Sequence, residues 1–236
     1  SGDEGQEITL YAGFNEQDEA RYIVERVQSW ILEGQDRSSV GVLYRSNAQS
    51  RVLEDAFISE GIPYRIYGGQ RFYERMEIRN ALAYMRLVVN RADDAAFERV
   101  INTPPRGIGS KTLEVLRDLS RSHNASLWET IKLASEQGSL ATRSLTAISG
   151  FKNLIDELDT QVNSLPLEEL VDCTIKSSGL LAYHGREAGE KGQARVENLE
   201  ELVSAAREFS PEMGGLSPLQ QFVDAAALEA GDSQAN

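Results

Sequence analysis

The chain has 236 residues, 41% of them hydrophobic and 26% charged, which is typical of a soluble globular protein with one or two domains. Its formal net charge of -13 argues against a protein that coats nucleic acid through its overall field, so any DNA contact has to be local. No apolar run approaches the roughly 20 residues that span a bilayer, so we expect no membrane segment. One cysteine, Cys173, excludes an internal disulfide and fits a reducing cytoplasm, and two histidines beside it do not support a metal site.

The first part of the chain alternates between strand-like and helix-like patterns. Short apolar runs predict three strands, at residues 8–10, 40–44 and 62–66. Asn15 and Asn47 are expected to cap the two helices between them. Two strand-helix-strand units imply a parallel sheet, and three strands are few for such a sheet. We therefore expect a partial α/β sheet over about residues 1–67, belonging to a larger domain.

The pattern changes after Gly68 and Gly69, and no further strand is predicted. Helical periodicity extends to the end of the chain, so we expect an all-α domain over residues 68–236 and a predominantly α protein overall. The expected helices cover residues 72–90, a short segment from 93, 110–122, 126–136, 140–162, 166–177, 194–208 and 217–229. The two glycines make a plausible hinge between the domains, and a plain turn is the alternative.

A turn rich in proline and glycine separates two of these helices. It presents free backbone N–H groups beside a helix N-terminus, and both attract phosphate. Ser110 or Thr112 is expected to cap the new helix, while Arg106 and Lys111 add positive charge. The alternative is an ordinary helix corner that binds nothing. The candidate DNA-contacting residues are Thr103, Arg106, Gly107, Ile108, Gly109, Ser110, Lys111 and Thr112.

A second candidate site follows the predicted strand at residues 40–44. In open α/β sheets ligands bind beyond the carboxyl ends of the strands, where this sequence has Tyr44 and Arg45. An arginine fork suits phosphate and a tyrosine face can stack on a base, so these two residues are candidates for nucleotide binding. In the alternative interpretation, Arg45 forms an ion pair with Glu54 or Asp55 on the next helix, and Tyr44 closes the core.

Several long segments resemble the UvrD, Rep and PcrA group of superfamily I DNA helicases, and its UvrD-type members most closely. The segments are Leu43 to Arg51, Pro63 to Gly69 with Phe72, Arg75, Glu77 and Ile78, Ala83 to Arg86, Asn102 to Thr112, Gly189 to Gln193 and Glu197 to Leu202. The resemblance therefore covers nearly the whole chain. Matches of this length are far more specific than one short motif.

The resemblance implies two RecA-like motor domains with helical insertions. Residues 1–67 would form the first half of the motor domain called 2A, and residues 68–236 the helical accessory domain called 2B. By resemblance, Tyr44 packs on adenine, Arg45 reaches the γ-phosphate, and the Gly-Ile-Gly turn contacts duplex DNA. The Gly68–Gly69 hinge would allow 2B to rotate.

The resemblance also implies the function of a longer parent protein. That parent would use ATP and Mg²⁺ to translocate 3′ to 5′ on DNA, unwind duplex at a single-strand/double-strand junction, and meet DNA repair proteins. This sequence has no Walker A lysine and no Walker B acidic pair, so we expect it to be inactive by itself, with no bound cofactor. The alternatives are a non-enzymatic DNA-binding module and a protein-interaction scaffold.

Overall fold

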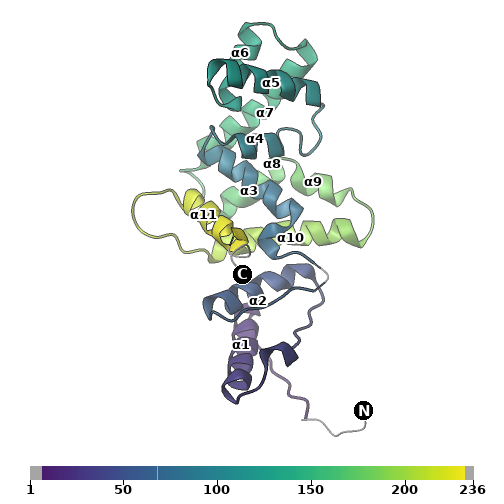
Figure 1. Cartoon of the computed structure of the whole chain (residues 1–236), viewed down its shortest axis with the longest axis vertical. Helices are drawn as coiled ribbons and strands as arrows, with labels where there is room; N and C mark the ends of the chain where they lie inside the picture. The colour runs from purple at the N-terminus through teal and green to yellow at the C-terminus, as the bar shows by residue number, and fades with distance from the viewer. Residues whose placement is uncertain (1–6, 68, 232–236) are drawn as a thin grey trace. The chain divides into compact units, whose positions relative to one another are not determined.

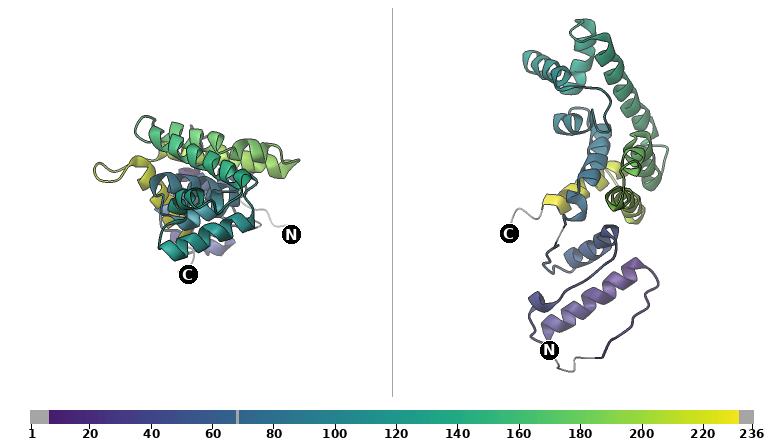
Figure 2. Two further views of the ribbon diagram at one scale, coloured as in Figure 1. Left: turned by 90° about the horizontal axis from the view of Figure 1, so that it is seen from above. Right: turned by 90° about the vertical axis from the view of Figure 1, so that its right-hand side faces the viewer.

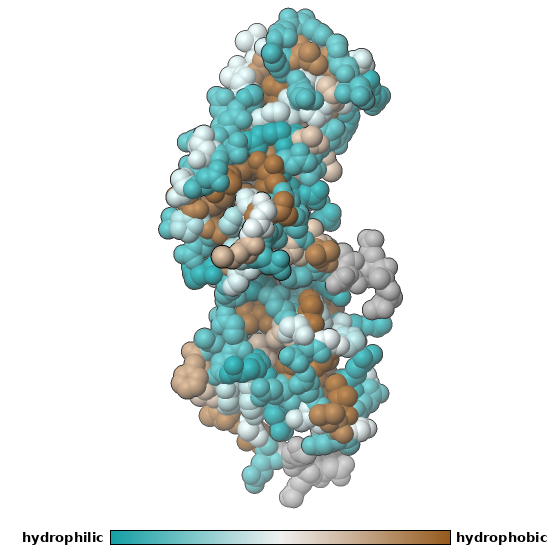
Figure 3. Space-filling view, turned by 90° about the vertical axis from the view of Figure 1, so that its left-hand side faces the viewer, coloured by the Kyte–Doolittle hydropathy of each residue, from teal (hydrophilic) through white to brown (hydrophobic). Residues whose placement is uncertain are grey.

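The computed structural model describes residues 7–67 and 69–231, and its regular elements are helices (Figure 1). The chain divides into two compact units, residues 1–72 and 73–236. No helix within the described residues is long and apolar enough to cross a membrane. Hydrophilic residues cover most of the face in Figure 3, and apolar patches lie between them.

The first unit is built from two α-helices and two short 3-10 helices. Asn15 caps α1, as predicted, because its side chain accepts a hydrogen bond of 2.8 Å from the amide of Asp18. The small apolar core of this unit consists of Val24, Val27 and Phe57 from the two α-helices. The elements are α1 (Glu16–Leu32), η1 (Arg37–Ser39), η2 (Asn47–Gln49) and α2 (Ser50–Ser59).

The predicted partial α/β sheet is wrong, because the described residues contain no strand. The three expected strand segments form neither a helix nor a strand ladder. In one of them Val42 packs against the small core while Leu43 is 99% exposed, and Ile8 in another is 100% exposed. A strand needs a neighbour for its backbone groups as well as an alternating pattern. Only the alternation at residues 62–66 agrees with the burial, since Ile62 and Tyr64 pack against the small core, and none of the three patterns identified a pairing partner.

The second unit is helical, as its periodicity predicts. Two differences from the expected helices are the short α9, which was missed, and α10, which begins at Glu190 rather than near residue 194. The elements are η3 (Phe72–Glu74), α3 (Met76–Val89), α4 (Asp94–Val100), α5 (Ser110–His123), α6 (Leu127–Glu136), α7 (Thr142–Gln161), α8 (Leu167–Ser177), α9 (Leu180–Gly185), α10 (Glu190–Glu208) and α11 (Pro218–Gly231).

Helix α3 is the centre of the second unit. It contacts α4, α7, α8, α10 and α11, and Figure 2 shows α7 running beside it from another angle. Ile78, Tyr84, Met85 and Leu87 on α3 are all fully buried. A helix that is apolar on most of its circumference has to be enclosed by others, and the surrounding helices satisfy this requirement.

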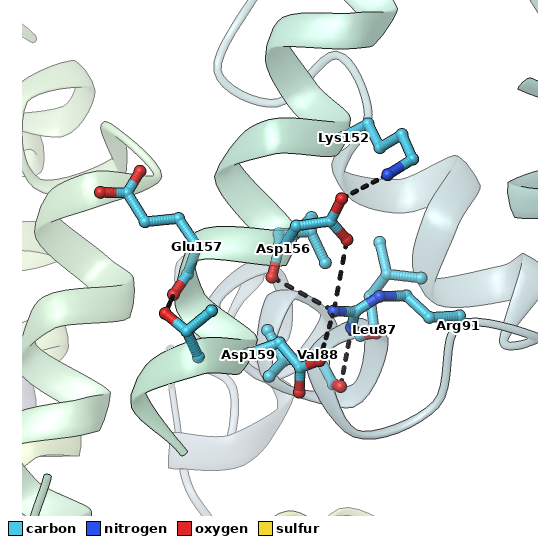
Figure 4. A network of polar contacts seen from close by, with 9 residues as sticks. Leu87, Val88, Arg91, Lys152, Asp156, Glu157 and Asp159 are labelled. Carbon is cyan, nitrogen blue, oxygen red and sulfur yellow. Dashed lines mark hydrogen bonds and ion pairs between the residues drawn. The ribbon is translucent and has the colours of Figure 1, made fainter. Parts of the chain in front are cut away.

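Arg91 closes the C-terminal end of α3 and ties it to α7 (Figure 4). Its Nη1 donates to the carbonyl oxygens of Leu87 (2.5 Å) and Val88 (2.7 Å), and its Nη2 donates to that of Ile155 (3.2 Å). The guanidinium also forms an ion pair of 3.4 Å with Asp159. Burial lowers the pKa of Arg91 from its ordinary value, because a low-dielectric site disfavours the charge. The arginine thus supplies the last turn of α3 with donors that the helix itself lacks.

We expect Arg91→Ala to reduce the free energy of unfolding of the second unit by about 2 kcal/mol, because several carbonyls lose a charged donor. Hydrogen exchange of the α3 amides would measure this change. Lys132→Ala is the matched control, since among the described residues Lys132 forms only an exposed pair with Glu136, and its loss should change stability by less than about 0.5 kcal/mol. Equal effects of the two variants would contradict the role assigned to Arg91.

Replacing each of two glycines on long helices by alanine should change the stability of the unit in opposite directions. A Cβ on Gly192 would lie 2.3 Å from the backbone oxygen of Glu187, whereas a Cβ on Gly150 would meet nothing within 4 Å. Gly192→Ala should therefore destabilise the unit by about 2 kcal/mol. Gly150→Ala should stabilise it by about 0.5 kcal/mol, because alanine favours a helix. Thermal unfolding of the two variants would test this, and a shift of the same sign in both would refute it.

Candidate nucleic-acid interface

The turn between α4 and α5 carries the predicted DNA-contacting residues. Helix α4 ends at Val100 and α5 begins at Ser110, so residues 101–109 form the connection. Gly107 has a φ of 77°, a left-handed conformation that favours glycine. Ile108 next to it is only 1% exposed and anchors the turn in the core. The anchored isoleucine leaves the two flanking glycines on the surface.

Asn102 organises the backbone of this turn. Its side-chain oxygen accepts hydrogen bonds from the amides of Arg106 (2.7 Å) and Ile108 (3.3 Å). An asparagine that bonds to amides a few residues ahead replaces part of a regular turn. The sequence contains this signal, yet Asn102 was not among the predicted site residues.

Four backbone amides, in the turn and at the start of α5, are available to an external acceptor. Within the part of the chain that the structure describes, the amides of Gly107, Gly109, Ser110 and Lys111 have no acceptor. All four residues are exposed. The first N–H groups of a 14-residue helix point outward here, at the positive end of its dipole. Such an arrangement is suited to an anion.

The expected side-chain cap of α5 is wrong. The N-cap residue is Gly109, and no side chain accepts a hydrogen bond there. Ser110 is already the first residue of the helix, and the buried Thr112 pairs its hydroxyl with that of Ser144 at 3.2 Å. The helix begins one residue too early for Ser110 and three residues too early for Thr112 to act as the N-cap. Without a cap, these amides stay free for an external acceptor.

The cationic residues of the turn differ in their surroundings. Lys111 is exposed and forms no ion pair within the described residues. Arg106 is half-buried, and its guanidinium donates to the backbone carbonyls of Val100, Pro104 and Ser178. Both residues were expected to add positive charge at the surface of the turn. Lys111 does present its charge to solvent, whereas the guanidinium of Arg106 is directed toward backbone carbonyls.

Tyr84 holds the other end of the turn. Its hydroxyl donates to the carbonyl oxygens of Thr103 (2.5 Å) and Val100 (3.2 Å). Burial raises the pKa of Tyr84 to about 12, so the phenol stays protonated and able to donate at neutral pH. Neither Tyr84 nor Ser178 could be linked to the turn from the sequence, because both are distant along the chain. Thr103 takes part through its carbonyl group.

Tyr44 and Arg45 lie in the first unit, immediately before η2. Arg45 is exposed and forms no ion pair within the described residues, and Tyr44 is 37% exposed. The alternative pairing of Arg45 with Glu54 or Asp55 is not seen. Glu54 instead accepts bonds from Ser50, Tyr64 and the amide of Phe72, while Arg51 pairs with Asp55 at 2.7 Å. Both candidate nucleotide-binding side chains are therefore accessible.

The remaining predicted features concern the hinge and metals. Gly68 lies outside the described residues, and Gly69 has room for a side chain, with only the side chain of Ile66 nearby at 3.7 Å. No group of three or more His, Cys, Asp or Glu residues that could hold a metal occurs in the described segments.

Comparison with known proteins identifies the family. The model of the UvrD-like helicase C-terminal domain matches residues 1–236. The chain is 51% identical to DNA helicase II of Escherichia coli (strain K12) over 237 residues, which cover 100% of this chain and 33% of that protein. It is 49% identical to DNA helicase II of Haemophilus influenzae over the same share of both chains. It is also 34% identical to the ATP-dependent DNA helicase PcrA of Staphylococcus epidermidis, over 87% of this chain and 28% of that protein.

The chain thus spans about a third of the length of these curated relatives. The family model covers every residue of the sequence, and relatives of two helicase types match most or all of it. The chain therefore belongs to the family of UvrD-like helicase C-terminal domains.

Proposed function

We propose that this chain is part of an ATP-dependent 3′–5′ DNA helicase that unwinds duplex DNA in repair. Its second unit would hold the duplex backbone at a single-strand/double-strand junction. The main support is the set of unpaired amides of four exposed residues at the N-terminus of α5, Gly107, Gly109, Ser110 and Lys111. The family and the printed names of its relatives, which are DNA helicases, agree with DNA as the ligand.

The turn suits a phosphate group of DNA better than a base. Backbone amides and a helix dipole recognise negative charge and carry no sequence information. Lys111 would add one charged contact from the same face of the turn. Ile108 would act only as the anchor, and the buried Thr112 would support the first turn of the helix. The resulting contact positions duplex DNA without reading its sequence.

The first unit would contribute to nucleotide binding in the parent protein. There Arg45 would approach the γ-phosphate of ATP and Tyr44 would lie against the adenine, since both side chains are accessible. The phosphate cradle and the Mg²⁺ ligands would come from elsewhere in the parent. In the family's terms, residues 1–67 would belong to motor domain 2A and residues 68–236 to accessory domain 2B, with Gly68 and Gly69 as the hinge. Binding to DNA repair proteins and location in a reducing cytoplasm are further predictions for the parent protein.

We expect the 236-residue chain to bind a short duplex weakly, with a dissociation constant of the order of 10⁻⁴ M or weaker at physiological salt. Gly109→Ala should weaken binding about tenfold, because a methyl group enters the space where phosphate approaches the backbone. Nothing lies within 4 Å of that position in the free chain, so the fold should tolerate the change. Gly150→Ala, on the outside of α7, is the matched control and should leave binding unchanged. NMR titration with the duplex would measure both.

The salt dependence of the same titration tests the charged contact. Lys111→Ala should reduce the slope of log K against log salt by about one, because one fewer counterion is released. The shifts should centre on residues 106–112. Shifts centred elsewhere, or equal shifts with a single strand, would exclude the duplex-holding role.

We expect the isolated chain to bind ATP weakly or not at all, because Tyr44 and Arg45 supply only part of a nucleotide site. Calorimetric titration with ATP and Mg²⁺ would reveal any binding, and micromolar affinity would contradict the expectation. In the parent protein, Arg45→Ala should lower kcat for ATP hydrolysis about a hundredfold while DNA affinity changes little. Equal losses in both would argue against contact with the γ-phosphate.

A further inference from the structure

The side chain of Arg106 is directed into the protein by three backbone carbonyl groups. Its Nη1 donates to the oxygens of Val100 and Pro104, each at 3.1 Å, and its Nη2 donates to that of Ser178 at 2.8 Å. The first carbonyl belongs to the last residue of α4, the second lies in the turn itself, and the third follows α8, 72 residues after Arg106. The planar guanidinium fork can reach several acceptors at once from one fixed position.

Two aromatic rings also surround this guanidinium. Its central carbon lies 5.6 Å from the centroid of Tyr84 and 5.5 Å from that of Phe151. Both rings are almost completely buried. No carboxylate pairs with Arg106 within the described residues, so carbonyl dipoles and ring faces balance its charge. Moving the side chain outward to a phosphate would leave these buried acceptors without their donor, which is costly.

The segment containing Ser178 is in direct contact with the turn. A Cβ placed on Gly179 would lie 3.7 Å from the ring of Pro104, an ordinary van der Waals distance. Gly179 has a φ of 83°, a left-handed conformation that favours glycine, and it is the N-cap of α9. The hydrogen bond from Arg106 to Ser178 therefore links the turn, immediately before Gly107, to the junction of α8 and α9.

We infer that Arg106 is a positioning residue, which fixes the backbone of the Gly107–Lys111 turn and does not itself contact the ligand. The inference rests on the proposed function in one respect, since the ligand is taken to be a phosphate of duplex DNA. It differs from the expectation drawn from the sequence, in which Arg106 is one of the cations that contact DNA. It also extends the site to Ser178, which holds the turn from another helix pair.

Comparing Arg106→Lys with Arg106→Gln distinguishes positioning from direct contact. Lysine keeps the charge but cannot bond to three carbonyls in one plane. If Arg106 positions the turn, both variants should lose duplex affinity to a similar extent, about tenfold. If it contacts phosphate directly, Arg106→Lys should bind nearly as well as the wild type while Arg106→Gln does not, and that result would overturn the inference.

A measurement without DNA tests the positioning role independently of the proposed function. In both variants the amide resonances of Gly107 and Gly109 should shift and their hydrogen exchange should become faster, while the α3 amides remain protected. Arg117→Gln is the matched control, because Arg117 lies on α5 but pairs with the partly exposed Glu98 at 2.6 Å. It removes the same charge and should leave the turn amides unchanged.

The two proposals can fail separately. If wild-type shifts on adding duplex lie outside residues 106–112, the DNA-holding role is wrong, and the measurements without DNA still decide whether Arg106 fixes the turn. If Arg106→Gln leaves the Gly107 and Gly109 amides unchanged, the positioning role is wrong, whatever the duplex affinity. Protection of the α3 amides shows in each case that the second unit remains folded.

Discussion

Burial of α3 is the constraint on which the second unit depends. This helix is apolar on most of its circumference, so five other helices have to enclose it. Its C-terminal end and its middle then determine other parts of the unit. The C-terminal carbonyls of α3 receive Arg91, and Tyr84 in the middle of the helix reaches the carbonyls beside the candidate DNA-contacting turn. The position of the turn is therefore a consequence of core packing.

Two arginines perform the same physical task at different places. Arg91 and Arg106 each direct a guanidinium toward three backbone carbonyls from two separate segments. Arg91 lies beside one aromatic ring, that of Trp128, and Arg106 beside two. In a chain with a net charge of -13, these cations are part of the internal structure. The charge available to DNA at the turn is then a single exposed side chain, Lys111, together with uncharged amides. A contact of this kind is expected to be weak and independent of base sequence.

The first unit shows why an alternating pattern does not by itself make a sheet. Val42 faces a small cluster formed by α1 and α2, while the neighbouring Leu43 faces solvent. The pattern was correct about inward-facing side chains at residues 62–66, but Ile8 and Leu10 are exposed and the run at residues 40–44 is not buried on both faces. Sheet formation also requires a neighbouring backbone in register, and the described residues provide none. The two accessible side chains, Tyr44 and Arg45, lie in this part of the unit, where the backbone amide of Arg45 donates to the side-chain oxygen of Gln49 at 3.1 Å.

The sequence by itself determined most of the helices, the capping role of Asn15 and the presence of a turn within the stretch from Asn102 to Thr112, because these features depend on residues close together in the chain. Its resemblance to UvrD-type helicases agreed with the family later identified by comparison. Only the tertiary structure decided that Arg106 turns inward, that Tyr84 and Ser178 hold the turn, and that α5 has no side-chain cap. Each of these depends on contacts between residues far apart in the chain, and such contacts leave no local periodicity or spacing in the sequence.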